Sequence, residues 1–132
     1  MAFIKPLFHA GAPRRPRKDV EHQIQTACVN WFRLAYPKLG RLLFAVPNGG
    51  ARSAATASML KAEGVVSGVS DLLLLVPSAG FHGLCIEMKT PKGRQSESQK
   101  LWQTEAEEQG YCYALCRSLD DFIRTINFYL NN

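Results

Sequence analysis

The chain has 132 residues, of which 46% are hydrophobic and 20% are charged, a composition typical of one globular domain with a single core. No apolar run approaches the length of a membrane span, and the N-terminal residues lack a signal-peptide pattern, so we expect a cytoplasmic protein without membrane partners. The four cysteines include no C-x-x-C pair, and we expect them to be reduced core residues.

The net charge of +5 comes entirely from the first 18 residues, because the rest of the chain carries eleven basic and eleven acidic residues. Three prolines and the lack of periodicity predict a flexible N-terminal arm, residues 1–18, ahead of a folded domain, residues 19–132. Basic side chains neutralise phosphates, so we expect the arm to bind DNA, although a solubilising tail would have the same composition. The residues expected to make these contacts are Arg14, Arg15, Arg17 and Lys18.

Hydrophobic spacing, caps and turn residues predict four helices and four strands in the folded domain. In chain order these are a helix over residues 19–35, a strand over 41–46, a helix over 53–63, strands over 72–76 and 83–89, a helix over 98–109, a strand over 111–116 and a helix after Ser118. The order predicts an α/β fold, with a mixed sheet flanked by helices. In the third helix we expect Leu101, Trp102 and Ala106 to face inward.

The middle of the chain reads as a hairpin with acidic residues at its open end. An apolar run begins after Asp71, turn residues fill positions 77–81, and alternation resumes at Gly83. If the strands pair antiparallel about Ala79, facing residue numbers sum to about 158, which places Asp71 opposite Glu87. Side chains alternate along a strand, so Glu87 and Lys89 point to the same face.

Two opposed carboxylates repel each other and destabilise a sheet, whereas a divalent cation between them removes the repulsion. Mg²⁺ is usually held by one or two carboxylates together with water and substrate phosphate. We therefore predict that Asp71 and Glu87 bind a metal ion and that Lys89 completes a phosphate site. The alternative is an ordinary strand-end aspartate beside an exposed ion pair.

Asp71 with Glu87-Met88-Lys89 resembles the PD-(D/E)XK nuclease signature, and the flanking residues resemble its VRR-NUC branch. The flanking features are Glu21, Val46-Pro47-Asn48-Gly49-Gly50, Gly64, Gly68-Val69-Ser70-Asp71, Thr90 and Gln99. The resemblance covers roughly residues 19–117. Ser70 stands where the family usually has proline, a position that shapes the backbone and takes no part in the chemistry.

The resemblance implies a restriction-endonuclease-like fold and an Mg²⁺-dependent DNA endonuclease in a bacterial or phage-infected cell, with Mn²⁺ able to substitute. The Met88 carbonyl joins Asp71 and Glu87 as an expected metal ligand, and Lys89 is expected to orient the attacking water. Glu21 and Gln99 are expected accessory catalytic residues, and Glu21 is a further candidate ligand, although a carboxylate near a helix start is also favoured by the helix dipole.

Four further residues are expected to contact DNA, although each would be equally typical of a turn or a solvated loop. They are Asn48, Arg52, Lys92 and Arg94. Similarity to single-domain Holliday-junction resolvases implies a homodimer acting on branched DNA, with the apolar C-terminal helix or residues 110–116 as the interface. A flap or end-processing nuclease and a non-catalytic nucleic-acid-binding module are the alternatives.

Overall fold

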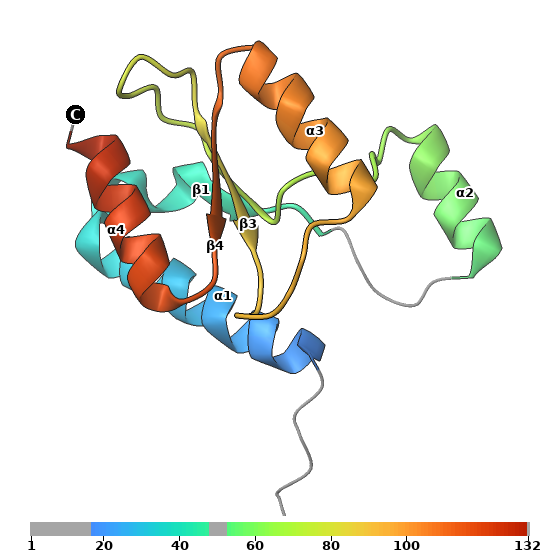
Figure 1. The fold of residues 1–132 in the computed structure, drawn as a ribbon, viewed down its shortest axis with the longest axis horizontal. Coiled ribbons are helices and arrows are strands. Elements are labelled where there is room, and N and C mark those ends of the chain that lie inside the picture. The colour runs from blue at the N-terminus through green and yellow to red at the C-terminus, as the bar shows by residue number, and fades with distance from the viewer. Residues whose placement is uncertain (1–16, 48–52, 132) are drawn as a thin grey trace, which may run out of the picture.

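The protein is described here by a computed structural model that places residues 17–47 and 53–131 (Figure 1). The elements are α1 (Arg17–Ala35), η1 (Pro37–Leu42), β1 (Leu43–Ala45), α2 (Ala54–Ala62), β2 (Leu72–Leu74), β3 (Leu84–Met88), α3 (Glu97–Glu108), β4 (Cys112–Cys116) and α4 (Leu119–Leu130). The predicted order is confirmed. The first strand is shorter than expected, because Pro37 starts a 3₁₀ helix that takes up residues through Leu42.

The four strands form one mixed sheet in the order β1-β2-β3-β4. The pairs β1–β2 and β2–β3 are antiparallel, whereas β3 and β4 are parallel. Parallel neighbours require a long crossover, and α3 provides it. The predicted fold class, a mixed sheet flanked by helices, is therefore confirmed.

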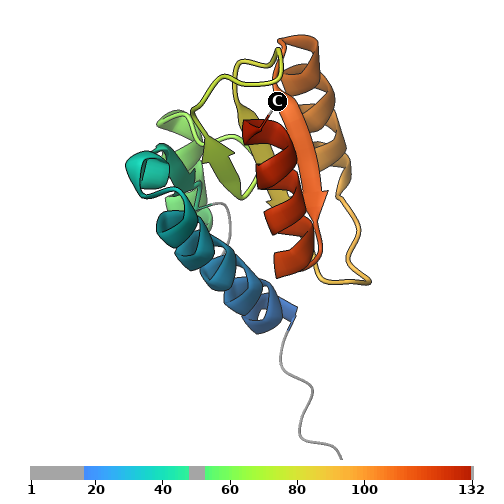
Figure 2. The same ribbon diagram turned by 90° about the vertical axis from the view of Figure 1, so that its left-hand side faces the viewer.

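The core lies on the face of the sheet that α1 and α4 cover, as the two views show (Figures 1 and 2). Alternate strand residues supply it, and they pack against the two helices. The fully buried members are Cys28, Phe32, Leu43, Leu72, Leu74, Leu84, Ile86, Met88, Cys116, Phe122, Ile126 and Tyr129. All four cysteines are unbridged, as predicted, and three are buried.

Cys85 and Glu87 alternate with these residues and point to the opposite face. This second face is covered in part by α3, where the Trp102 ring lies 6.3 Å from the ring of Tyr113 on β4. The prediction for α3 is wrong at Leu101, because this residue is 61% exposed. One helix over one face of a small sheet buries only a narrow stripe, and Leu101 falls outside it.

The hairpin register is the predicted one, with Leu72 opposite Ile86 and Leu74 opposite Leu84. The turn, however, is not centred on Ala79 as expected. It consists of the two residues Ala79 and Gly80, both of which have positive φ. Such a two-residue turn matches the twist of the strands. The extra residue is absorbed between Leu74 and Ser78, so the register at the open end of the hairpin is unaffected.

Helix α2 stands apart from the rest of the fold (Figure 1), and none of its residues is buried. Ser53 caps it as predicted, since its side chain accepts a hydrogen bond from the Thr56 amide. Within the described residues, no helix is both long enough and apolar enough to cross a membrane.

Candidate active site

A cavity of about 720 Å³ opens at the end of the sheet where the C-terminal ends of β1 and β3 lie beside the start of β2. The N-terminal half of α1 forms one wall, and the first turn of α3 reaches the other side. The lining residues are Asp19, Glu21, His22, Gln25, Thr26, Ala45, Val46, Pro47, Asp71, Glu87, Met88, Lys89 and Gln99. Every expected catalytic residue is in this set.

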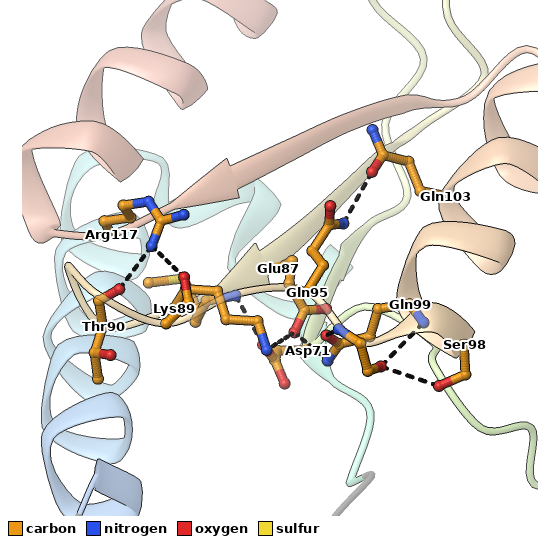
Figure 3. Close-up of polar contacts among 12 residues, drawn as sticks. Asp71, Glu87, Lys89, Thr90, Gln95, Ser98, Gln99, Gln103 and Arg117 are labelled. Carbon is orange, nitrogen blue, oxygen red and sulfur yellow. Dashed lines mark hydrogen bonds and ion pairs between the residues drawn. The ribbon is translucent and has the colours of Figure 1, made fainter.

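Glu87 is the buried centre of this cavity, with only 1% of the residue exposed. Its Oε1 accepts a hydrogen bond from Gln99 Nε2 at 2.9 Å and lies 3.8 Å from Lys89 Nζ (Figure 3). Its Oε2 is also buried and receives no hydrogen bond from the described part of the chain, although the protonated Glu87 carboxyl can donate one to Asp71. In the ionised form a buried oxygen without a donor is costly, so a cation at this position would stabilise the Glu87 carboxylate.

Asp71 is held beside Glu87 by the backbone of β3. Its Oδ2 accepts a hydrogen bond from the Met88 amide at 2.7 Å. The preceding residue, Ser70, is fully buried, and its hydroxyl donates to the Leu72 carbonyl at 3.2 Å. This hydrogen bond restrains the backbone just before β2, and Ser70 is the position at which the family resemblance predicts proline.

Gln99 links the start of α3 to the acidic centre. The Ser96 hydroxyl accepts from the Gln99 amide nitrogen, and Gln99 Oε1 accepts from the Ser96 amide at 2.8 Å, which together form a capping box. The cap leaves Gln99 Nε2 directed at Glu87. The Gln99 side chain therefore both caps the N-terminus of α3 and orients the Glu87 carboxyl group.

The electrostatic surroundings of Glu87 disfavour its charge. Burial raises the pKa of its carboxyl from 4.5 to about 8. The negative charge of Asp71, a hydrogen bond from the protonated Glu87 carboxyl to Asp71 and the negative charge of Glu21 act in the same direction, whereas Lys89 opposes them. The metal-free protein therefore keeps Glu87 protonated near neutral pH. A bound divalent cation would reverse this balance.

The donor set fits a hard cation. Among the residues that the structure describes, no three His, Cys, Asp or Glu side chains form a metal-binding cluster by themselves. Mg²⁺ needs fewer protein ligands, because one or two carboxylates usually hold it together with water and substrate phosphate. The carboxylates of Asp71 and Glu87 meet this requirement.

The remaining predicted residues lie at different places. Glu21 is partly buried in α1 and lines the cavity, whereas Lys92 and Arg94 are exposed on the loop between β3 and α3 and are not part of the lining. The other predicted DNA contacts lie outside the described residues, or outside those whose side chains are described. They are Arg14, Arg15, Arg17, Lys18, Asn48 and Arg52.

Four lining residues on α1 were not predicted. They are Asp19, His22, Gln25 and Thr26. Their spacing was available in the sequence, because residues three and four positions apart share one helix face. Glu21 and Gln25, like His22 and Thr26, are four positions apart, so the expected site at Glu21 extends along the helix.

We predict that Glu87→Gln stabilises the metal-free protein increasingly as pH rises from about 5 to 8. The folded state keeps the Glu87 proton up to a pKa of about 8, whereas the unfolded state loses it near 4.5. The wild-type protein therefore loses stability through this interval, on the order of a few kcal/mol, and a glutamine does not titrate. Thermal unfolding in chelator-containing buffers across this pH range measures the difference.

Glu97→Gln is the matched control, because the Glu97 side chain on α3 is 93% exposed. It should leave the pH dependence of wild-type stability unchanged. Parallel stability curves for Glu87→Gln and wild type would contradict the proposed burial of a protonated Glu87.

The sequence matches the model of the VRR-NUC domain family over residues 14–120. Among solved structures, one described as a VRR_NUC domain protein is similar, with a TM-score of 0.75 and 26% identity, and covers 85% of this chain and 88% of that chain. Another, described as a VRR_NUC domain, has a TM-score of 0.53 and 17% identity, covers 83% of this chain and 97% of that one, and shows the shared fold alone. No curated protein matches the chain.

The family match includes both helices and all the strands that form the cavity. Its matched region also contains Asp71, Glu87, Lys89 and Gln99, which the structure brings together. Fold, cavity and sequence match agree, and the chain belongs to the VRR-NUC domain family, which has a nuclease-type fold.

Proposed function

We propose that the protein is an Mg²⁺-dependent DNA endonuclease that acts on branched DNA as a homodimer. The observation that carries the proposal is the buried Glu87 carboxyl group, which lies in a cavity beside a second acidic residue and a lysine. Two adjoining acidic groups resist ionising together unless a cation is present, and the set is typical of a site that binds a cation and a phosphate together.

Asp71 and Glu87 would hold Mg²⁺, with the Met88 carbonyl as a third ligand, Glu21 as a further candidate and Mn²⁺ as a substitute. When bound, the ion lowers the pKa of water and neutralises charge on the phosphate. The hydrogen bond from the Met88 amide orients Asp71, and the bond from Gln99 orients Glu87. These contacts fix both carboxylates before any ligand arrives.

Lys89 supplies a positive charge at the same place. Its side chain is 13% exposed, and its ammonium lies 3.8 Å from Glu87 Oε1. From there it orients the attacking water or neutralises the phosphoryl oxygens as charge develops on them. The rate gain comes from placement, because the lysine is already held in the cavity before the substrate binds.

We predict that replacing the five basic residues of the arm with glutamine weakens DNA binding and flattens its salt dependence. Each lost phosphate contact removes roughly 0.9 from the slope of log affinity against log salt. Fluorescence anisotropy with labelled DNA at several salt concentrations measures this slope. Substitution is preferable to deletion because α1 begins at Arg17. The five residues are Lys5, Arg14, Arg15, Arg17 and Lys18.

Lys38→Gln with Arg41→Gln provides a control, since both residues are exposed on η1 and neither lines the cavity. This control should bind DNA with the wild-type slope. If the arm variant also kept the wild-type slope, the arm would be a solubilising tail and its predicted DNA contacts would be wrong.

We predict a symmetric dimer that cuts four-way junctions faster than linear duplex. One site per chain cuts one strand, and resolution of a junction requires two cuts related by two-fold symmetry, which a C₂ dimer supplies. Each of the two expected interfaces carries an exposed large apolar residue, since Phe128 on α4 is 70% exposed and Tyr111, just before β4, is 38% exposed. Light scattering and a panel of labelled duplex, flap, splayed-arm and junction DNA test both parts.

The panel also separates the alternatives. A monomer that cuts flaps or ends as fast as junctions would be an end-processing nuclease. DNA binding without cleavage of any substrate, with or without Mg²⁺ or Mn²⁺, would identify a non-catalytic nucleic-acid-binding module and reject the proposed endonuclease.

A further inference from the structure

We propose that Arg117 is a positioning residue for Lys89. Its guanidinium holds the loop that follows Lys89, and the loop in turn confines the Lys89 side chain beside Glu87. This inference rests on the proposed nuclease function, but one of its tests does not require activity.

Arg117 follows directly after β4 and reaches across to the loop between β3 and α3 (Figure 3). Its Nη1 donates to the carbonyl oxygens of Thr90 at 2.8 Å, Pro91 at 3.3 Å and Gly93 at 2.6 Å. Hydrogen bonds from a charged group are stronger than neutral ones. One side chain thus holds three carbonyls within four consecutive residues.

The base of Arg117 is itself fixed. Its backbone amide donates to Asp121 Oδ2 at 3.0 Å, in the first turn of α4. In the described part of the chain Arg117 forms no salt bridge, and the other Asp121 oxygen pairs with Arg124. The hydrogen bonds of the Arg117 guanidinium therefore go to the loop carbonyls.

The loop that Arg117 holds is packed against the lysine. Gly93 is buried, and a Cβ at this position would lie 3.4 Å from Lys89 Cδ and 3.1 Å from Thr90 Oγ1. Gly93 also donates its amide to the Thr90 carbonyl at 3.0 Å, which closes the turn. Gly93 therefore lies beside the aliphatic part of the Lys89 side chain.

The other side of Lys89 is fixed by the sheet, since its amide donates to the Cys116 carbonyl at 2.9 Å. The residue next to Cys116 is Arg117. The end of β4 therefore holds the Lys89 backbone through the Cys116 carbonyl, and it restrains the Lys89 side chain through the loop that Arg117 binds. The ammonium is then left beside Glu87 Oε1. Loss of the Arg117 contacts releases the loop and lets the lysine leave this position.

The main experiment compares Arg117→Ala with Arg124→Ala in DNA cleavage. Arg124 is a matched control, because it also interacts with Asp121, but through its guanidinium, and its side chain is 74% exposed. The assay is run well below the unfolding temperature of each variant. Arg117→Ala should lower kcat on the order of 100-fold, and its KM should change less than about twofold. Arg124→Ala should retain wild-type kcat, and Arg117→Lys, which keeps one cationic donor group, should recover part of the rate.

The second readout is the rate at which Lys89 is labelled by reductive methylation in the native protein, followed by mass spectrometry. Arg117→Ala should speed labelling of Lys89 while leaving exposed Lys38 unchanged. Arg117→Lys, which replaces the guanidinium by a single ammonium group, should also speed Lys89 labelling relative to wild type, but less than Arg117→Ala. This variant keeps the proposal testable if Arg117→Ala fails to fold.

Unchanged Lys89 labelling in Arg117→Ala would overturn the proposal even if kcat fell, because the arginine would then act by another route. Equal acceleration at Lys38 and Lys89 would overturn it as well, since it would indicate general loosening. An inactive wild-type protein would reject the proposed function, and Lys89 labelling would still decide whether Arg117 positions the lysine.

Discussion

Glu87→Gln and Asp71→Asn are each expected to reduce metal-dependent DNA cleavage about 1,000-fold or more. Each replacement removes a negative charge at nearly constant shape. Metal binding at the site contributes several kcal/mol to stabilising the transition state, and each 1.36 kcal/mol corresponds to tenfold in rate. Single-turnover cleavage of labelled DNA in saturating Mg²⁺ measures the loss.

The fold should survive both substitutions. Asparagine at position 71 keeps an oxygen that can accept the Met88 amide, and glutamine at position 87 keeps one that can accept from Gln99. DNA affinity should change little, because the metal ligands are separate from the basic residues. Glu97→Gln, an exposed carboxylate on α3, should cleave at the wild-type rate. Wild-type cleavage by either ligand variant would show that its carboxylate is dispensable.

Lys89→Ala should lower turnover on the order of 100- to 1,000-fold while leaving metal binding largely in place. An ammonium group is not a metal ligand, but its charge at 3.8 Å from Glu87 Oε1 is placed to act on the reacting phosphate. The expected outcome is therefore a split between two measurements, kinetics and metal affinity.

Metal affinity is best measured by calorimetric titration at pH 8.5, where competition with the Glu87 proton is reduced. Lys100→Ala is the control, because Lys100 forms only an exposed pair with Glu97 on α3, and it should leave both measurements unchanged. A collapse of metal affinity in Lys89→Ala would make Lys89 a structural residue, contrary to its assigned role.

The local part of the site could be predicted from the sequence. Strand alternation places Glu87 and Lys89 on one face, and the hairpin register brings Asp71 opposite Glu87. The register is the observed one even though the turn is centred between Ala79 and Gly80. The difference is absorbed between Leu74 and Ser78, so it does not reach the acidic end of the hairpin.

Contacts between segments that are distant in the sequence could not be predicted from strand alternation or hairpin register. Arg117 has no sequence feature that directs it to the Thr90–Gly93 loop, because the contact depends on the parallel pairing of β3 and β4. The exposure of Leu101 likewise depends on how little of the sheet α3 covers. Hydrophobic spacing identifies a helix, but it does not tell how wide a face its partner will bury.

Gln99 lies between these cases. Its place near the start of a helix was evident, and Ser96 three residues earlier is a recognisable capping signal. The hydrogen bond to Glu87 could not be read from the cap, because it depends on the packing of α3 against the sheet. Its role in orienting the carboxylate is thus visible only in the folded chain.

The most direct test of the central claim is a cleavage assay on wild-type protein that has been stripped of metal by chelation and then supplied with Mg²⁺. A labelled four-way junction and its matching linear duplex serve as substrates, and the Asp71→Asn/Glu87→Gln double variant is run in parallel. The account predicts no cleavage by the stripped protein, cleavage restored by Mg²⁺ or Mn²⁺, and no restoration in the double variant. Equal cleavage with and without metal, or equal restoration in wild type and double variant, would contradict a metal-dependent site at Asp71 and Glu87.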